Sequence, residues 1–573
     1  MDRAVAGAAM SAGAGRGDHL TSVPPEEVGD VPGTTPAEEQ RRGLARRSFL
    51  ARSAAVAAMS AGAAAVAAQP AAAAPASGLR VPRGAAPTAV EDPTTLTLVE
   101  AALAMAAGTL SAVELVQAHL ERVERLEGTY RAHNALLVEE ALVAARRADR
   151  RRRSNPYGGL PITLKDNLFT AGVPTTANST IFADFVPPYD STVGARLVAA
   201  GGVVVGKGQM GPLATTRATT PAGVVTTVNA WTPADPSVSP GGSSSGPATA
   251  VAGRLALASL GTQTGGSITA PANAQGLTGL KPTMGRTSIR GIIPLSFTRD
   301  HVGPLAKDAL DAAVVLQAMA GPDDGDARTL GLPAVPDLVR AATPVTSGRR
   351  AALRRRTRVG VPPDFLAVTG DELAARQALL TTLRGVRGLT LVDVTYPEDW
   401  DLQSGTFNVV RLPERTEPFR PWLQQDLTLF GVSVLSWLQG LLMSGDEWVT
   451  GQRAKHHFLA EVLGDLLGRQ CDVVLQTSPV PFDVVGLPEI AFPIGLGSPR
   501  PDGTTLPLGT ILGGAPYEED RLLEVVAAYQ SVTDWHRRRP ADPVVPAAGA
   551  RSLTATAAPE VRLDAIAAAE QTQ

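Results

Sequence analysis

The stretch that decides the fold lies between residues 239 and 283: Ser239-Pro-Gly-Gly-Ser-Ser-Ser-Gly246, a run of small residues, Leu260-Gly-Thr-Gln-Thr-Gly-Gly-Ser267, and Gly279-Leu-Lys-Pro-Thr283. Two loops rich in glycine and serine therefore flank one helix of small residues and one apolar strand. Glycine lets the backbone approach a substrate closely, and consecutive amides in such a loop can converge on one oxygen. The serine hydroxyls are candidate nucleophiles. The stretch predicts a catalytic centre built on two adjacent loops.

Around this stretch, short apolar runs alternate with helical segments, which is typical of a buried sheet with helices on both faces. Ser111-Ala-Val-Glu114 forms a capping box at the start of an amphipathic segment that extends to Leu126, and a second helix is expected over 136–153. The sequence thus predicts an α/β fold with a central twisted mixed β-sheet. The expected strands are 160–164, 203–205, 255–260, 358–361, 389–394, 472–475, 490–494 and 508–512.

Composition narrows the class of function. The chain has 573 residues, 44% of them hydrophobic, and can bury a large core. Its 52 basic and 55 acidic residues give a formal net charge of −3, and the basic residues form only short arginine clusters, so nucleic acid is not an expected partner.

Cysteine, histidine and lysine are scarce. The single cysteine, Cys471, excludes an intrachain disulfide and a cysteine-rich metal site, and we expect it to pack in the core. None of the seven histidines falls in a metal-ligand spacing, and we expect neither a metal nor an organic cofactor. Only five of the 52 basic residues are lysines, so their positions are informative.

The two Gly/Ser loops and the segment 279–283 resemble the amidase signature family. Upstream, Gly159-Leu-Pro-Ile-Thr-Leu-Lys-Asp-Asn167 matches the lysine segment of that family. The resemblance covers about residues 95–540, with no clear match over about 325–470, and it implies the amidase signature fold. Later landmarks of the family are matched at 291–296, 299–304, 486–495 and 507–514.

The resemblance implies roles for three residues: Ser267 as nucleophile, Ser243 as bridging serine after a cis peptide bond, and Lys165 as general base. A serine hydroxyl needs a base to take its proton, and a buried lysine can serve if desolvation holds it neutral, whereas a guanidinium stays protonated. The amides of Thr264, Gly265, Gly266 and Ser267 are expected to form the oxyanion hole.

The expected reaction is hydrolysis of a carboxylic amide C–N bond through a seryl acyl-enzyme, with release of ammonia or an amine from a small-molecule or peptide amide. Two alternatives stay open: an esterase or aryl acylamidase that uses the same site, and a non-catalytic amidase-like binding protein. The substrate-binding residues are not identified from the sequence.

The chain departs from the common family pattern beside the nucleophile. Gln263 stands where aspartate is frequent and Thr269 where arginine is frequent, so neutral groups replace a buried charge pair. With Ser245 and Gln275, these changes favour the peptide-amidase-like branch. We expect Asp166 to have a structural role in capping the following loop, with orientation of the Lys165 network as the alternative. Lys281 and Lys307 are expected in packing or surface positions.

A competing motif is present in the first loop. Gly242-Ser-Ser-Ser-Gly246 also fits the nucleophile elbow of an α/β-hydrolase, which would make Ser244 the nucleophile. That interpretation requires a strand that enters the turn, whereas residues 237–240 are polar and contain a proline. It also requires a downstream histidine, for which His456, His457 and His536 are candidates.

The N-terminal region resembles a twin-arginine signal. Arg46-Arg-Ser-Phe-Leu50 is followed by a weakly apolar run, residues 54–68, which is too short for a stable membrane anchor. We therefore expect an exported enzyme with the Tat translocation machinery as a partner. The expected organisation is a signal peptide and leader (1–75), a linker (76–94), an amidase domain (95–540, with a core at 158–310 and a variable substrate-side region at about 325–470) and a disordered tail (541–573).

Overall fold

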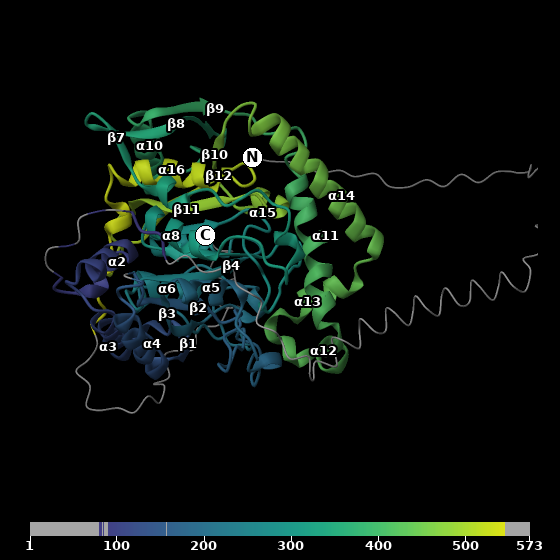
Figure 1. Cartoon of the computed structure of the whole chain (residues 1–573). Helices are drawn as coiled ribbons and strands as arrows, with labels where there is room; N and C mark the ends of the chain where they lie inside the picture. The colour runs from purple at the N-terminus through teal and green to yellow at the C-terminus, as the bar shows by residue number, and fades with distance from the viewer. Residues whose placement is uncertain (1–78, 83, 85–86, 88–89, 156, 545–573) are drawn as a thin grey trace, which may run out of the picture. The chain divides into compact units, whose positions relative to one another are not determined.

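The computed structural model describes residues 79–82, 84, 87, 90–155 and 157–544 (Figure 1). The chain divides into two compact units, residues 1–70 and 71–573, and the first lies wholly outside the described residues. The predicted signal peptide therefore lies outside them too. All elements named below belong to the second unit.

The described strands form one mixed sheet in the order β1-β3-β2-β4-β6-β5-β11-β12-β10-β8-β7, with β9 paired to β8. The pairs of β2 with β3 and with β4 are parallel, whereas the pairs from β4 through β6, β5, β11 and β12 to β10 are antiparallel. The strands are β1 (His133–Leu136), β2 (Leu160–Lys165), β3 (Gly202–Gly208), β4 (Ala258–Gln263), β5 (Thr278–Lys281), β6 (His301–Ala306), β7 (Val345–Ser347), β8 (Arg350–Val361), β9 (Arg387–Asp393), β10 (Val473–Gln476), β11 (Glu489–Leu496) and β12 (Pro507–Gly514).

Apolar residues cover both faces of this sheet. Neighbouring residues of one strand point to opposite faces. On β11, Ile490 and Phe492 join one buried cluster and Ala491 joins another, and on β12 Leu512 and Ile511 divide in the same way. The helices that supply these clusters and the rest of the fold are α2 (Leu98–Ala107), α3 (Ala112–Tyr130), α4 (Val138–Arg150), α5 (Thr192–Ala200), α6 (Ser245–Ala252), α7 (Thr269–Gln275), α8 (Ala309–Met319), α9 (Leu338–Ala342), α10 (Gly370–Arg384), α11 (Leu402–Thr416), α12 (Arg420–Gln425), α13 (Val434–Leu442), α14 (Gly445–Glu461), α15 (Val480–Val485) and α16 (Glu519–Gln530).

The predicted α/β class and mixed sheet are confirmed, and each of the eight expected apolar runs contributes to a strand. The capping box is present as well, since the Glu114 amide donates to Ser111 Oγ (3.1 Å) and the Ser111 amide to Glu114 Oε2 (2.8 Å). Four strands were not predicted: β1, β5 and β7 have only three or four residues, and β6 begins with a histidine and contains a proline.

Two segments differ from their predicted character. The many proline, glycine and arginine residues of 322–356 predict a surface connection, but Arg350 begins β8, and Leu338 of α9 is buried in the core. Asp542, placed in the predicted tail, pairs with Arg122 and Arg254. Residues 545–573 lie outside the described part of the chain.

Helices α11 to α14 run together along one flank of the sheet (Figure 1). Their aromatic residues pack inward, where Phe419, Phe430 and Trp437 share an apolar cluster with Leu213 and Ile293. The region with no clear family match is thus folded against the loops beside the Gly/Ser segments. Within the described residues no single helix is long and apolar enough to cross a membrane; Leu427–Leu442 and Gly445–Leu466 pass that test only as a pair, bent by 93°.

Candidate active site

Lys165 ends β2, and its side chain is fully buried. Its Nζ lies 2.7 Å from Ser243 Oγ, 2.9 Å from Thr262 Oγ1 and 3.2 Å from the Thr262 carbonyl oxygen. All three partners are neutral oxygens. Burial lowers the pKa of Lys165 well below its usual value, and only the negative charge of Asp300 opposes this shift.

Ser243 lies at the turn that leads into α6, and its peptide bond with Gly242 is cis, as the resemblance implies. The side chain is buried, and the Ser243 carbonyl oxygen accepts a hydrogen bond from the Gly211 amide (3.2 Å). The strands thus bring together two residues 78 positions apart, the predicted base and the predicted bridging serine.

Ser267 lies in the loop between β4 and α7 and is 8% exposed. Among the described residues, no hydrogen bond is formed by its hydroxyl, and the amides of Gly265 and Ser267 donate to no acceptor. These groups are free to meet a ligand. Thr264 is anchored on both sides, because its hydroxyl donates to Asp300 and its carbonyl oxygen accepts from Arg299 Nη2 (2.8 Å).

The Gly266 amide differs from its predicted role. It donates to Asp483 Oδ2 at 2.6 Å, so it is already engaged and orients the loop. Gly266 has φ +82°, a left-handed conformation that favours glycine, and an added Cβ would lie 3.2 Å from Pro479 Cγ. The loop therefore leaves the amides of Thr264, Gly265 and Ser267 without an acceptor among the described residues, while the Gly266 amide is held by Asp483.

A buried charged cluster supports this loop from the opposite side of β4. Lys281 Nζ lies 3.3 Å from Asp483 Oδ1 and 3.2 Å from Glu489 Oε2, and all three side chains are fully buried. Gln263 Nε2 donates to the same two carboxylates at 2.8 and 3.1 Å. Burial raises the pKa of Glu489 well above its usual value, and the positive charge of Lys281 opposes that shift.

Gln263 also holds the start of α7. Its Oε1 accepts from the amides of Ile268 (2.7 Å) and Thr269 (2.9 Å). Position 263, where the family frequently has aspartate, is a neutral glutamine in this chain. The negative charge beside it comes from Asp483 and Glu489. Of the predicted packing or surface positions, Lys281 has a buried one, where it is also an ion-pair partner of both carboxylates.

The remaining lysines have other surroundings. Lys207 pairs with Asp166 at 3.3 Å, and Asp166 Oδ2 also accepts from the hydroxyl (2.6 Å) and amide (3.1 Å) of Thr176, so its predicted structural role is confirmed. Lys307 is fully buried and donates to the carbonyl oxygens of Thr94 (2.9 Å) and Leu96 (2.5 Å), which confirms packing.

Ser244 does not have the surroundings of a nucleophile elbow. Its hydroxyl donates to the Thr262 carbonyl oxygen (3.3 Å), and no strand enters the turn from residues 231–242. No histidine bonds to it within the described residues. The α/β-hydrolase interpretation is therefore wrong. Cys471 is buried in the core, and burial raises its pKa to about 12, which disfavours a thiolate nucleophile.

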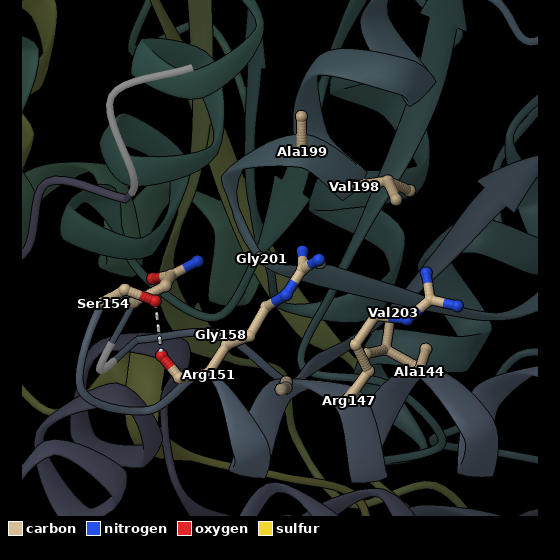
Figure 2. Close-up of a pocket in the computed structure, with 13 residues that line it drawn as sticks. Ala144, Arg147, Arg151, Ser154, Gly158, Val198, Ala199, Gly201 and Val203 are labelled. Carbon is tan, nitrogen blue, oxygen red and sulfur yellow. Dashed lines mark hydrogen bonds between the residues drawn. The ribbon is translucent and has the colours of Figure 1, made fainter. Parts of the chain in front are cut away.

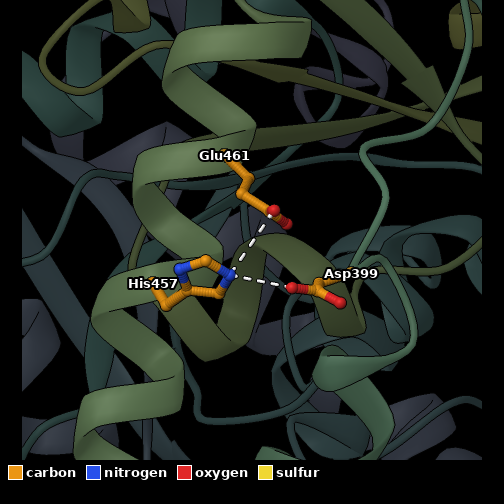
Figure 3. Close-up of side chains that lie close together, drawn as sticks. All are labelled: Asp399, His457 and Glu461. Carbon is orange, nitrogen blue, oxygen red and sulfur yellow. Dashed lines mark hydrogen bonds and ion pairs between the residues drawn. The ribbon is translucent and has the colours of Figure 1, made fainter.

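Three potential metal ligands meet on the outer side of α14 (Figure 3). His457 Nε2 lies 2.8 Å from Asp399 Oδ2 and 3.5 Å from Glu461 Oε1. The hydrogen bond with Asp399 raises the pKa of His457, so a protonated imidazole explains the approach of both carboxylates. This arrangement is an exposed ion pair, and sequence spacing could not reveal it because Asp399 is 58 residues from His457.

Sequence reasoning missed Thr262, Asp300 and Asp483 as parts of the site. Thr262 follows Gly261 in the motif that ends at Ser267, and Asp300 lies in the matched segment 299–304. The motifs could therefore have pointed to both residues. Burial raises the pKa of Asp300, whose carboxylate accepts from the Leu295 (2.8 Å) and Ser296 (3.1 Å) amides. Asp483 lies more than 200 residues from its partners and precedes the nearest matched segment.

Comparisons with known proteins agree with this geometry. A family model described as Amidase matches residues 114–407. A glutamyl-tRNA(Gln) amidotransferase subunit of Chloroflexus aggregans is 36% identical over 499 residues, covering 78% of this chain and 98% of the relative. The corresponding subunit from Cyanothece sp. is 31% identical over 487 residues, covering 75% and 96%. The solved structure of native peptide amidase from Stenotrophomonas maltophilia aligns with a TM-score of 0.66 at 29% identity, covering 78% and 99%.

These relatives correct the prediction of export. They are named as subunits of an enzyme for glutamyl-tRNA(Gln), and charged tRNA belongs to protein synthesis inside the cell. The predicted secreted location is therefore wrong, and so is the Tat machinery as a partner. Residues 46–68 contain only an arginine pair and an alanine-rich run, and this pattern is too short to identify a signal peptide.

Proposed function

Because the chain belongs to the amidase family, an enzyme family that cleaves amide C–N bonds, we propose that it does so through an acyl-enzyme on Ser267, with Ser243 and Lys165 as the proton relay. The observation that carries the proposal is the surroundings of Lys165: a fully buried amine 2.7 Å from Ser243 Oγ, with which no carboxylate of the described residues pairs.

The three contacts of Lys165 fit a neutral amine as well as an ammonium, and burial without a paired carboxylate among the described residues favours the neutral form. A neutral lysine has two N–H donors and one lone pair, and Lys165 has three partners. The two Thr262 oxygens can accept the N–H groups, which leaves the lone pair for the Ser243 hydroxyl. Ser243 can then accept the proton of Ser267 while it gives its own proton to Lys165.

The reaction runs in two steps. The Ser267 oxygen attacks the amide carbonyl carbon, its proton passes through Ser243 to Lys165, and the same route returns a proton to the leaving nitrogen as the C–N bond breaks. Water then attacks the acyl-enzyme by the same relay and releases the acid. The amides of Thr264, Gly265 and Ser267 serve the oxyanion, while Gly266, engaged by Asp483, positions the loop.

The substrate is proposed to be a linear peptide or small-molecule amide. The peptide amidase from Stenotrophomonas maltophilia, which this chain matches over 99% of that protein's length, supports this choice. We further propose that residues 95–540 form the catalytic domain, with the helices of the 325–470 region on the substrate side.

A second candidate function rests on the amidotransferase relatives. The chain covers 98% of the Chloroflexus aggregans subunit, so an ammonia-releasing subunit of a larger amidating enzyme is the alternative. In that case glutamine is the substrate, and activity depends on a partner chain. A third candidate function is that of an esterase or aryl acylamidase that uses the same site.

One panel separates these candidates: an amidated peptide, an aryl anilide, a fatty amide, glutamine and an ester, with wild-type protein beside Ser267→Ala. We expect ammonia or amine release from the peptide amide only with wild type, and an acyl adduct on Ser267 by mass spectrometry. Turnover of glutamine alone favours the amidotransferase role, and cleavage of the ester alone favours an esterase. Equal activity of Ser267→Ala, with its circular dichroism unchanged, would contradict the nucleophile assignment.

A further inference from the structure

A pocket of about 410 Å³ lies at the other end of β2 from Lys165 (Figure 2). Its residues come from the end of α4, the turn before β2, and the junction of α5 with β3. Six residues of β2 separate it from the catalytic amine, about 17 Å along the strand. This pocket is therefore distinct from the proposed active site, and its volume lies in the range of small-molecule sites.

Two arginines border the pocket on one side. Arg147 and Arg151 are one helical turn apart, and Figure 2 shows both guanidinium groups extending from the end of α4 toward the chain at Gly201 and Val203. Among the described residues, no acidic side chain forms an ion pair or hydrogen bond with either guanidinium. Their charges therefore repel each other across one turn of helix without compensation.

The surrounding charge is also positive. Residues 146–153 read Arg-Arg-Ala-Asp-Arg-Arg-Arg-Arg, six arginines and one acid. That acid, Asp149, is already engaged, because its carboxylate accepts from the amides of Ala112 (2.7 Å) and Val113 (3.1 Å) at the start of α3. The six arginines are exposed, and none of them pairs with an acidic side chain in the described part of the chain.

The opposite wall is apolar and close to the backbone. Val198 and Val203 contribute its side chains, Gly158 and Gly201 contribute backbone, and Ala144 lies beside Arg147 on α4. This backbone is firmly tied, since the Gly159 amide donates to the Gly201 carbonyl oxygen at 2.7 Å. A ligand would thus find two forked cationic donors facing a rigid, partly apolar wall.

We propose that this pocket binds a small phosphate-bearing molecule, with its phosphate held between Arg147 and Arg151. A guanidinium matches phosphate oxygens in a bidentate, charge-assisted geometry, and two such groups suit a doubly charged anion. The inference is independent of the chemistry at Ser267.

Pyrophosphate and inorganic phosphate are suitable probes, measured by titration calorimetry on the full chain at about 150 mM salt, where exposed charges are screened beyond about 8 Å. Arg147→Gln/Arg151→Gln should weaken pyrophosphate binding at least about tenfold. The matched control is Arg150→Gln/Arg153→Gln, which removes the same charge from the same helix end but lies outside the pocket, and it should change binding less than about twofold. Amide hydrolysis by both double variants should equal that of wild type and so verifies the fold.

Equal weakening by the two double variants would overturn the proposal, because it would assign binding to diffuse charge. Absence of pyrophosphate binding to wild type would overturn it as well. An oligoribonucleotide that binds wild type far more tightly than pyrophosphate, and loses affinity equally in both variants, would identify the arginines as a nucleic-acid surface instead.

Discussion

The end of β4 lies between two buried lysines whose surroundings differ in charge. On one side Thr262 offers two neutral oxygens to Lys165, and on the other Gln263 shares two carboxylates with Lys281. Adjacent residues of a strand point to opposite faces, so one short segment separates the two sites. A lysine without a carboxylate partner can lose its proton and act as a base, whereas a lysine between carboxylates serves as a fixed counter-charge.

Replacing Lys165 should have the largest effect on turnover. Lys165→Met removes the base and should lower kcat/KM by about 10²–10⁴-fold, while the free energy of unfolding stays equal or rises because a buried amine becomes apolar. Lys165→Arg should not restore activity, since a guanidinium stays protonated. Steady-state kinetics and urea unfolding measure both effects, and an active Lys165→Arg enzyme would contradict the assignment.

Replacing Lys281 should instead affect stability. Lys281→Met leaves Asp483 and Glu489 buried without their counter-charge, which should cost about 3–5 kcal/mol of unfolding free energy. Urea titration beside Lys165→Met provides the comparison. Equal stability of the two variants would remove the distinction between the two lysines.

The pH dependence should show the state of Lys165. Because the neutral amine is active, kcat/KM should rise about tenfold per pH unit below its lowered pKa and level off above it, so two units change the rate about 100-fold. The same group makes stability rise with pH between its lowered folded pKa and its ordinary value of 10.5, since the unfolded chain binds more protons there. A rate that stays flat at pH values below the lowered pKa would contradict a titrating base.

The smallest expected effect concerns the Gly266 contact. Asp483→Asn keeps an oxygen acceptor for the Gly266 amide but removes its charge, and we expect kcat to fall about tenfold with KM little changed. Glu489→Gln is the matched control, because it removes a charge from the same cluster without touching Gly266. If both variants lose kcat equally, the cluster acts through charge alone and not through the amide contact.

The sequence predicted one of the two lysine sites. Lys165, Ser243 and Ser267 lie in short motifs whose order and spacing are distinctive, so the mixed α/β fold and the candidate residues followed from them. The strands that local pattern missed, such as β5, are short and held by partners on both sides. Local propensity carries little information for them.

The second lysine site could not be predicted for a different reason. Lys281 meets Asp483 and Glu489 through contacts between residues about 200 positions apart, and no local pattern encodes such a distance. Gln263, in place of the frequent aspartate, indicates that this position has lost a negative charge. Only the folded sheet shows that Asp483 and Glu489 provide negative charge beside it. Phe407 of α11, whose ring lies against Gly265, comes from the region with no clear motif at all.

The central claim is that Lys165 is neutral in the folded enzyme, and NMR of ε-¹³C-labelled lysine tests it most directly. The chain has only five lysines, so Lys165→Met assigns the signal by its disappearance. We predict that this signal titrates well below 10.5 and has the chemical shift of a neutral amine on the active plateau of the pH profile. A Lys165 signal that keeps the shift of a charged ammonium throughout that plateau would contradict the assignment of Lys165 as the base.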